Sequence, residues 1–175
     1  MKLVKHRLNC EELESRRNPS VVSVAFTGGN LNITGDNAGN IFTLQENVQG
    51  AYFMTAGSNT FLNGAAAIFL GSIRPVNIYI RDGNGSDHIQ VIGVRGVNIF
   101  NVQTGTGNDF VNLAGVSANY VGVFENFGNN TLETTNVVAH IGASLIAGNG
   151  FNEWIDNSLS AGVYLNERGW SEIIR

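Results

Sequence analysis

The chain has little charge, little proline and almost no cysteine, and each shortage excludes a class of protein. Charged residues make up 14% of the 175 residues, and only two prolines stand beside 22 glycines. A hydrophobic content of 43% with so few charges is unlike a disordered protein, which is rich in charge and poor in apolar residues. The single cysteine, Cys10, excludes an internal disulfide, and it has no neighbouring ligands for a zinc site.

Long apolar runs and basic stripes are missing as well. No apolar run approaches the length of about 18 residues that crosses a bilayer, so we expect no transmembrane segment. The first residues are basic but lack the apolar stretch and cleavage site of a secretory signal. The net charge is −4 and the ten Lys and Arg form no continuous stripe, which argues against nucleic acid as a partner.

Residues 1–20 differ in composition from everything that follows. They are charged and contain no glycine. Asn9 can cap a helix, Glu12 lies three residues later in the capping-box position, and Pro19 follows the expected end of the helix. The sequence therefore predicts a leader with a short capping helix at 1–20 and one repeat domain at 21–175.

The repeat domain is built from blocks of one strand, a Gly/Asn turn and a second strand. The turn glycine recurs at intervals of 22, 21 and 22 residues, at Gly85, Gly107, Gly128 and Gly150. The residue that opens the second strand keeps the same intervals, at Asp87, Asp109, Asn130 and Asn152. Weaker copies surround Asn40 and Gly64. Repeats of this length with alternating apolar residues are typical of a solenoid, since one repeat cannot bury its apolar face alone.

We therefore predict an all-β fold, a right-handed parallel β-helix of about six turns with repeats of about 22 residues. Equivalent residues of successive turns should stack about 4.8 Å apart. On this register Val76 lies against Val97, and Ile89 lies against Val111. The alternative is an antiparallel sandwich or barrel, which Gly/Asn turns also suit but which gives no reason for a constant period.

Two turns, Asp82–Gln90 and Thr104–Asn112, resemble the glycine-rich nonapeptide of the RTX calcium-binding family. The resemblance covers little of the chain. Asp82 and Thr104 replace the leading glycine, and later copies carry Asn in place of the Asp. It implies calcium held between two stacked turns. The metal-ligating candidates on this interpretation are Asp82, Gly83, Gly85, Asp87, Gly105, Gly107 and Asp109.

The same residues also suit plain turn chemistry, because Gly, Asn and Asp favour tight turns and Asn side chains bond neighbouring backbone. Asn108, Asn129 and Asn152 occupy nearly equivalent places, so an asparagine ladder is expected. Ligand charge is missing from most turns. We favour this interpretation and expect no cofactor, with calcium as the alternative.

Catalytic motifs are weak. Parallel β-helices resemble polysaccharide lyases and hydrolases in architecture, and such sites need clustered carboxylates. The best cluster consists of Asp82, Asp87, His88 and Asp109. The turns are short, and the GTGND segment lacks the Lys-Ser/Thr of a phosphate-binding loop. We expect a protein that is not an enzyme, and a carbohydrate-active enzyme stands third among the hypotheses.

The N-terminal segment carries one further resemblance, at Leu13, Glu14, Arg16, Pro19 and Ser20. It is similar to the L-E-x-R leader of surface and exported repeat proteins of planctomycete-type bacteria. This implies a cell-envelope or extracellular setting. The function expected first is a non-enzymatic structural or interaction module that presents a rigid solenoid to a protein or polysaccharide of the cell envelope. A calcium-binding β-roll is the second hypothesis.

Overall fold

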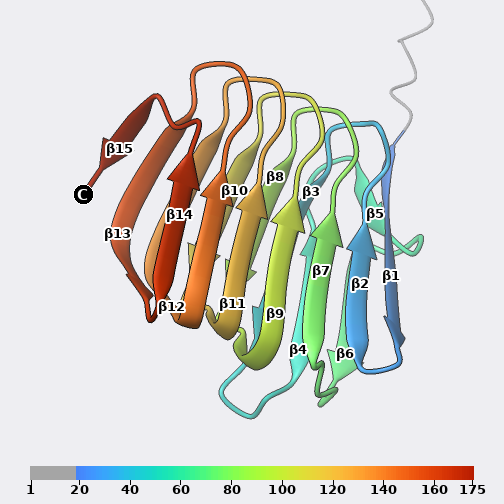
Figure 1. Cartoon of the computed structure of the whole chain (residues 1–175). Coiled ribbons are helices and arrows are strands. Elements are labelled where there is room, and N and C mark those ends of the chain that lie inside the picture. Colours follow the sequence, from blue (N-terminus) through green and yellow to red (C-terminus); the bar gives the residue numbers. More distant parts are fainter. Residues whose placement is uncertain (1–18) are drawn as a thin grey trace, which may run out of the picture.

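The computed structural model describes residues 19–175, which form 15 β-strands and no helix (Figure 1). The helix expected near residues 9–18 and the leader motif up to Arg16 lie outside this range. Within it, no helical segment of a length and hydropathy that would cross a membrane is found. The strands stack as a β-solenoid, so the predicted fold class is confirmed.

Two parallel sheets face each other and are joined by tight bends at both edges (Figure 1). We call them the front and back sheets. The long strand β12 (Thr131–Ile146) belongs to both, because its first half pairs with back-sheet strands and its second half with front-sheet strands. The front sheet also contains β2 (Asn30–Thr34), β7 (Asn77–Arg81), β9 (Arg95–Gln103), β11 (Ser117–Phe124) and β14 (Tyr164–Arg168). The back sheet also contains β3 (Ile41–Glu46), β8 (His88–Ile92), β10 (Phe110–Ala114), β13 (Glu153–Ala161) and β15 (Glu172–Ile174).

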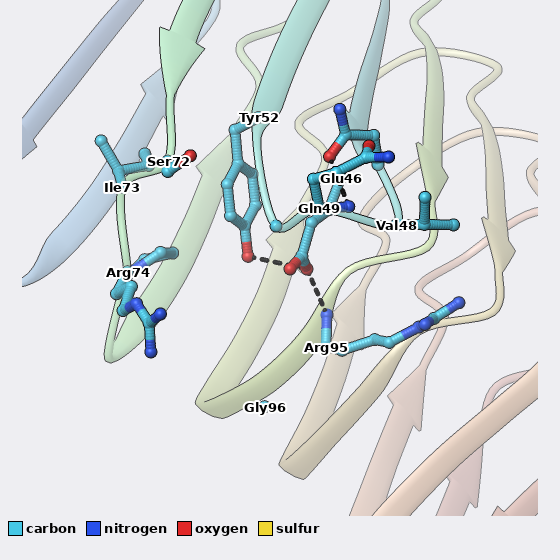
Figure 2. A pocket seen from close by; sticks show the side chains of 12 residues that line it. Glu46, Val48, Gln49, Tyr52, Ser72, Ile73, Arg74, Arg95 and Gly96 are labelled. Carbon is cyan, nitrogen blue, oxygen red and sulfur yellow. Dashed lines mark hydrogen bonds between the residues drawn. The ribbon is translucent and has the colours of Figure 1, made fainter.

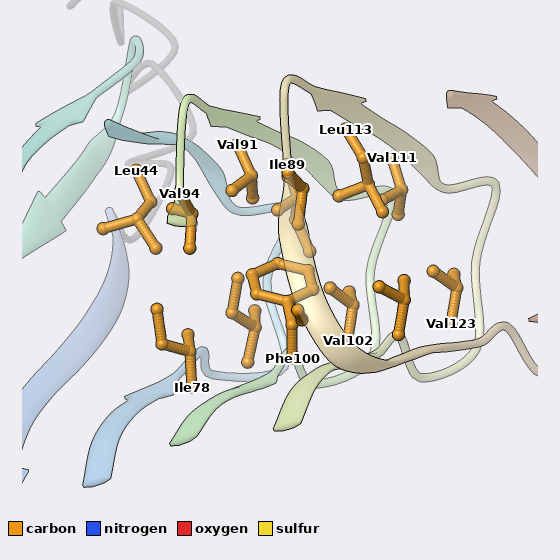
Figure 3. Close-up of a cluster of buried hydrophobic side chains, with 14 of the residues drawn as sticks. Leu44, Ile78, Ile89, Val91, Val94, Phe100, Val102, Val111, Leu113 and Val123 are labelled. Atoms are coloured by element: carbon orange, nitrogen blue, oxygen red, sulfur yellow. The ribbon is translucent and has the colours of Figure 1, made fainter. Parts of the chain in front are cut away.

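The core lies between the two sheets, where inward side chains of successive turns stack in columns (Figure 3). Ile89 pairs with Val111, as the period predicts, and Val111 pairs with Leu132. Ile78 of the front sheet pairs with Phe100. All five side chains are fully buried, because the period-2 alternation of each strand turns every second residue inward.

The expected stacking of Val76 on Val97 is wrong. Val76 lies just before β7, opposite Asn98, whose backbone N–H donates to the Val76 carbonyl at 2.7 Å. Its side chain is 55% exposed, whereas Val97 is buried. The alternation seen at Ile78 and Ile80 therefore does not extend backward through the bend that precedes the strand.

The bends repeat with the same period as the strands. In the upper bend, the glycines Gly85, Gly107, Gly128 and Gly150 all have positive φ. A Cβ atom on Gly128 would strike the Gly107 carbonyl, so each glycine permits the close approach of the preceding turn. The lower bend also repeats a positive φ at intervals of 22, 21 and 22 residues, at Gly93, Gly115, Asn136 and Ser158.

The N-terminal part of the domain departs from the solenoid pattern. The turn before Asn40 stacks on the turn of Asp87, so that weak copy is confirmed. The copy expected around Gly64 is instead part of a mixed arrangement, antiparallel except where β5 pairs with β1, and the solenoid has about four turns where six were expected. The strands of this arrangement are β1 (Ser20–Thr27), β4 (Tyr52–Ala56), β5 (Thr60–Leu62) and β6 (Ala67–Gly71). They cover the edges of β2 and β3 that would otherwise be unpaired.

At the opposite end, the apolar columns finish on charged side chains. Glu167 follows Leu145 in one column, and Asp156 follows Thr134 in another. Arg175 contacts both carboxylates, at 2.7 Å and 3.7 Å, and its guanidinium lies 5.3 Å from the Trp154 ring centre. The last turn thus closes the core with an ion-pair cluster.

Candidate functional site

The two turns that resemble the calcium motif lie side by side in the upper bend, as predicted. Asp82–Asp87 connects β7 to β8, and Thr104–Asp109 connects β9 to β10. Their glycines allow the stacking described above. Consecutive turns are joined by backbone hydrogen bonds, since the Gly85 N–H donates to the Thr106 carbonyl at 2.8 Å and the Gly107 N–H to the Phe127 carbonyl at 2.8 Å.

A ladder of buried side chains ties the turns together along the inside of this bend. Oδ1 of Asp87 accepts the Asn40 backbone N–H at 2.8 Å, and Oδ1 of Asp109 accepts the Asp87 N–H at 3.0 Å. Asn130 and Asn152 continue the pattern at 3.0 Å and 3.2 Å. Aspartate and asparagine therefore perform the same bonding at equivalent positions, since each accepts through one side-chain oxygen.

The expected asparagine ladder is confirmed in part. Oδ1 of Asn108 accepts the Asn129 N–H at 2.8 Å, and Oδ1 of Asn129 accepts the Phe151 N–H at 2.9 Å. This ladder lies on the exposed side of the bend. Asn152, expected in the same row, belongs instead to the buried ladder.

A second buried column runs beside the first and holds Asp82, Thr104 and Glu125, each the first residue after β7, β9 and β11. Glu125 was not predicted, although it follows Asp82 and Thr104 at intervals of 22 and 21 residues. Continuing the period from the aspartate would have identified it. Asp82 is 8% exposed and Glu125 2% exposed.

The two columns together place four acidic side chains inside the bend with little to neutralise them. Oδ2 of Asp82, Asp87 and Asp109 and both carboxylate oxygens of Glu125 are buried without a hydrogen-bond partner among residues 19–175. A buried carboxylate without a partner is costly when charged, so it takes up a proton more readily.

The pKa values follow this physics. Burial, helped by the charge of Asp87, raises the pKa of Asp82 to about 8. Burial and the charge of Asp109 raise the pKa of Glu125 to about 8. Burial raises the pKa of Asp87 to about 6. The backbone N–H of Asn40 stabilises the charged form of this carboxylate and so limits the rise. The pKa of Asp109 is raised by burial as well. Near neutral pH, Asp82 and Glu125 are therefore largely protonated.

The structure separates His88 from the three aspartates of the expected catalytic cluster. His88 begins β8 with its side chain on the outer surface, where its ring stacks on Phe110 at 4.6 Å between centres. Asp82, Asp87 and Asp109 point to the inside of the bend. Across residues 19–175, no three His, Cys, Asp or Glu side chains converge in a geometry that holds a metal ion.

A separate hollow of about 470 Å³ lies where the loop after β3 meets the bends before β7 and β9 (Figure 2). Glu46 is at its centre. Its carboxylate accepts the Tyr52 hydroxyl at 3.0 Å and the Arg95 backbone N–H at 2.7 Å. Burial, with the neighbouring Glu46 charge, raises the pKa of Tyr52. Arg74 extends along the rim. Both hydrogen bonds end on Oε2, so this single carboxylate oxygen anchors the loop to the solenoid.

Comparison with known proteins identifies no relative. No protein-family model, no curated protein and no solved structure matches this chain.

Proposed function

We propose that this chain is a non-enzymatic structural and interaction module of the cell surface or extracellular space. The observation that carries the proposal is the front sheet, whose outward side chains form regular columns across five stacked strands from β7 to β14. Such a surface is held rigid, because every strand between its edges is paired on both sides.

The placement of the acidic side chains supports a role other than catalysis. Asp87, Asp109 and Glu125 are each 2% exposed and are directed into the bend, where a substrate in solvent has no access. A general acid or base must come within hydrogen-bonding distance of its substrate. These carboxylates instead bond the turns together or remain enclosed.

The cell-envelope setting rests on the leader resemblance at Leu13, Glu14 and Arg16. Antibody against the chain, applied to intact cells of its source, should label them, and external protease should remove the label without lysis. A protein that stays protected until the cells are lysed contradicts the proposed setting. Release of oligosaccharides from a panel of polysaccharides by the purified protein contradicts the non-enzymatic role.

A calcium-binding β-roll remains the second candidate. It is favoured by the unpartnered oxygens of Asp82, Asp87 and Asp109, since a cation would neutralise them. It is disfavoured by the Thr106 carbonyl, which the Gly85 N–H already occupies, and by the later turns, which carry Asn130 and Asn152 where the two motif turns carry Asp. Comparing the melting temperature in calcium and in EDTA distinguishes the two candidates.

A further inference from the structure

The outer surface of the front sheet carries aromatic side chains in register. Tyr120 of β11 pairs with Gly142 of β12, and Gly142 pairs with Tyr164 of β14. Tyr120 is 37% exposed and Tyr164 46% exposed. The two tyrosines therefore occupy one column, with backbones two strands apart, which is about 9.6 Å at ordinary strand spacing.

The glycines between these rings make the surface flat. A Cβ atom on Gly142 would overlap three carbons of the Tyr164 ring, so this ring lies directly over the Gly142 backbone. The Phe124 ring and the Asn101 amide cover Gly122 in the same way. Neither glycine has a positive φ, so their small size, and not their backbone freedom, is what these positions use. A ring that lies on the sheet turns its other π-face to solvent.

Amides and guanidinium groups surround the rings, and carboxylates do not. The next column holds Tyr79, Asn101, Gly122, Ser144 and Asn166. Arg81 and Arg168 occupy the upper margin, with the Arg81 guanidinium 5.2 Å from the Tyr79 ring centre. No Asp or Glu occupies an outward position of β7, β9, β11, the second half of β12 or β14.

Exposed π-faces interleaved with amides match a sugar chain. The C–H face of a pyranose packs on an aromatic ring, while its hydroxyls exchange hydrogen bonds with amides. A protein partner would need a well-packed apolar centre, and a nucleic acid a continuous positive groove, whereas this surface is flat and has two arginines.

We propose that the front sheet binds a linear polysaccharide that runs across the strands and stacks on Tyr120 and Tyr164. The inference rests on the proposed function, since it names the partner of that same surface. The test is native electrophoresis of the chain through gels that contain hydroxyethylcellulose, xylan or polygalacturonate, with a polymer-free gel as reference. At least one polymer should retard the protein, and the neutral and acidic polymers show whether the arginines contribute.

Tyr120→Ala/Tyr164→Ala should weaken this retardation, with at least about a tenfold rise in Kd. Gly142→Ala, which displaces the Tyr164 ring, should act in the same direction. Phe127→Ala/Phe151→Ala is the matched control, because it removes two exposed rings at the tips of the upper bend and should leave retardation unchanged. Unchanged circular dichroism and melting temperature must accompany the loss.

Retardation by none of the three polymers overturns the inference, as does equal retardation of the parent and the tyrosine double variant. Preferential retardation by poly(dT) would assign the surface to nucleic acid and overturn it too. Surface labelling of cells is independent of these outcomes, so a failure here leaves the proposed setting standing and can be distinguished from its failure.

Discussion

The buried acidic side chains of the upper bend make stability depend on pH in an unusual direction. The pKa of Asp82 is raised from 3.8 to about 8, and that of Glu125 from 4.5 to about 8. A carboxyl group whose pKa is raised by folding stabilises the native state fully below its unfolded pKa. This contribution is lost as pH rises toward the folded pKa. The protein should therefore become less stable between about pH 5 and pH 8.

The size of the change in the free energy of unfolding follows from the number of protons that the folded chain holds in excess of the unfolded chain. At pH 6 the folded chain holds about two more protons on these groups than the unfolded chain, so the free energy of unfolding falls by at most about 2.7 kcal/mol per pH unit. Over two pH units the loss reaches about 5 kcal/mol, comparable to the whole stability of a small domain. Asp87, with a pKa of about 6, adds to the loss at the acid end of this range.

The assay is urea unfolding followed by tryptophan fluorescence at pH 5, 6, 7 and 8 in EDTA, since Trp154 is fully buried and Trp170 packs against the core. Glu125→Gln removes the proton uptake of one group and should remove up to half of the slope. Glu172→Gln, an exposed carboxylate of β15, should leave the slope unchanged. A free energy of unfolding that is flat or rises from pH 5 to pH 8 in the parent protein would refute this description of the bend.

Three further predictions concern the core, the lower bend and calcium. Ile89→Asp should unfold the domain, because it buries an unpaired charge at a cost of several kcal/mol, while Gln90→Asp on the outer surface should stay cooperative in thermal melts. Ser158→Gly should raise the melting temperature by a few degrees, because φ is +92° there and glycine relieves the strain; a lower value would contradict this. Calcium and EDTA should give equal melting temperatures. A calcium-dependent rise of several degrees that Asp87→Asn/Asp109→Asn abolishes would establish the β-roll instead.

The sequence predicted the solenoid because its period is marked by positions where other residue types do not fit. Glycines such as Gly128 must recur where consecutive turns approach, and the pairing of Ile89 with Val111 follows once the period is known. The path of the chain from β3 to β7, through β4, β5 and β6, was not predictable from the same pattern. The Gly64 segment contains the turn and apolar residues of a repeat, but it forms a tight turn between β5, which pairs with β1, and β6, which pairs with β4.

The candidate site was also predicted only in part from the sequence. Asp87 and Asp109 were identified from the turn motif, and the structure places them on one ladder. Their burial could not be derived from the motif, because whether a turn side chain points inward depends on how the bend closes over it. Glu125 was not predicted, because the equivalent positions of the other repeats hold different residue types, Asp82 and Thr104, and so show no common motif.

The register of the stacked turns determines which side chains share the core, the buried ladders and the tyrosine column, and a pair of introduced cysteines tests it directly. Gln90 and Asn112 are paired across β8 and β10, about 4.8 Å apart, within the range that a disulfide spans. In a Cys10→Ser background, Gln90→Cys/Asn112→Cys should form an intramolecular disulfide on oxidation. Gln90→Cys/Glu133→Cys, two strands apart, should not. A failure of the first pair to close in the folded protein, or efficient closure of the second, would contradict the solenoid register.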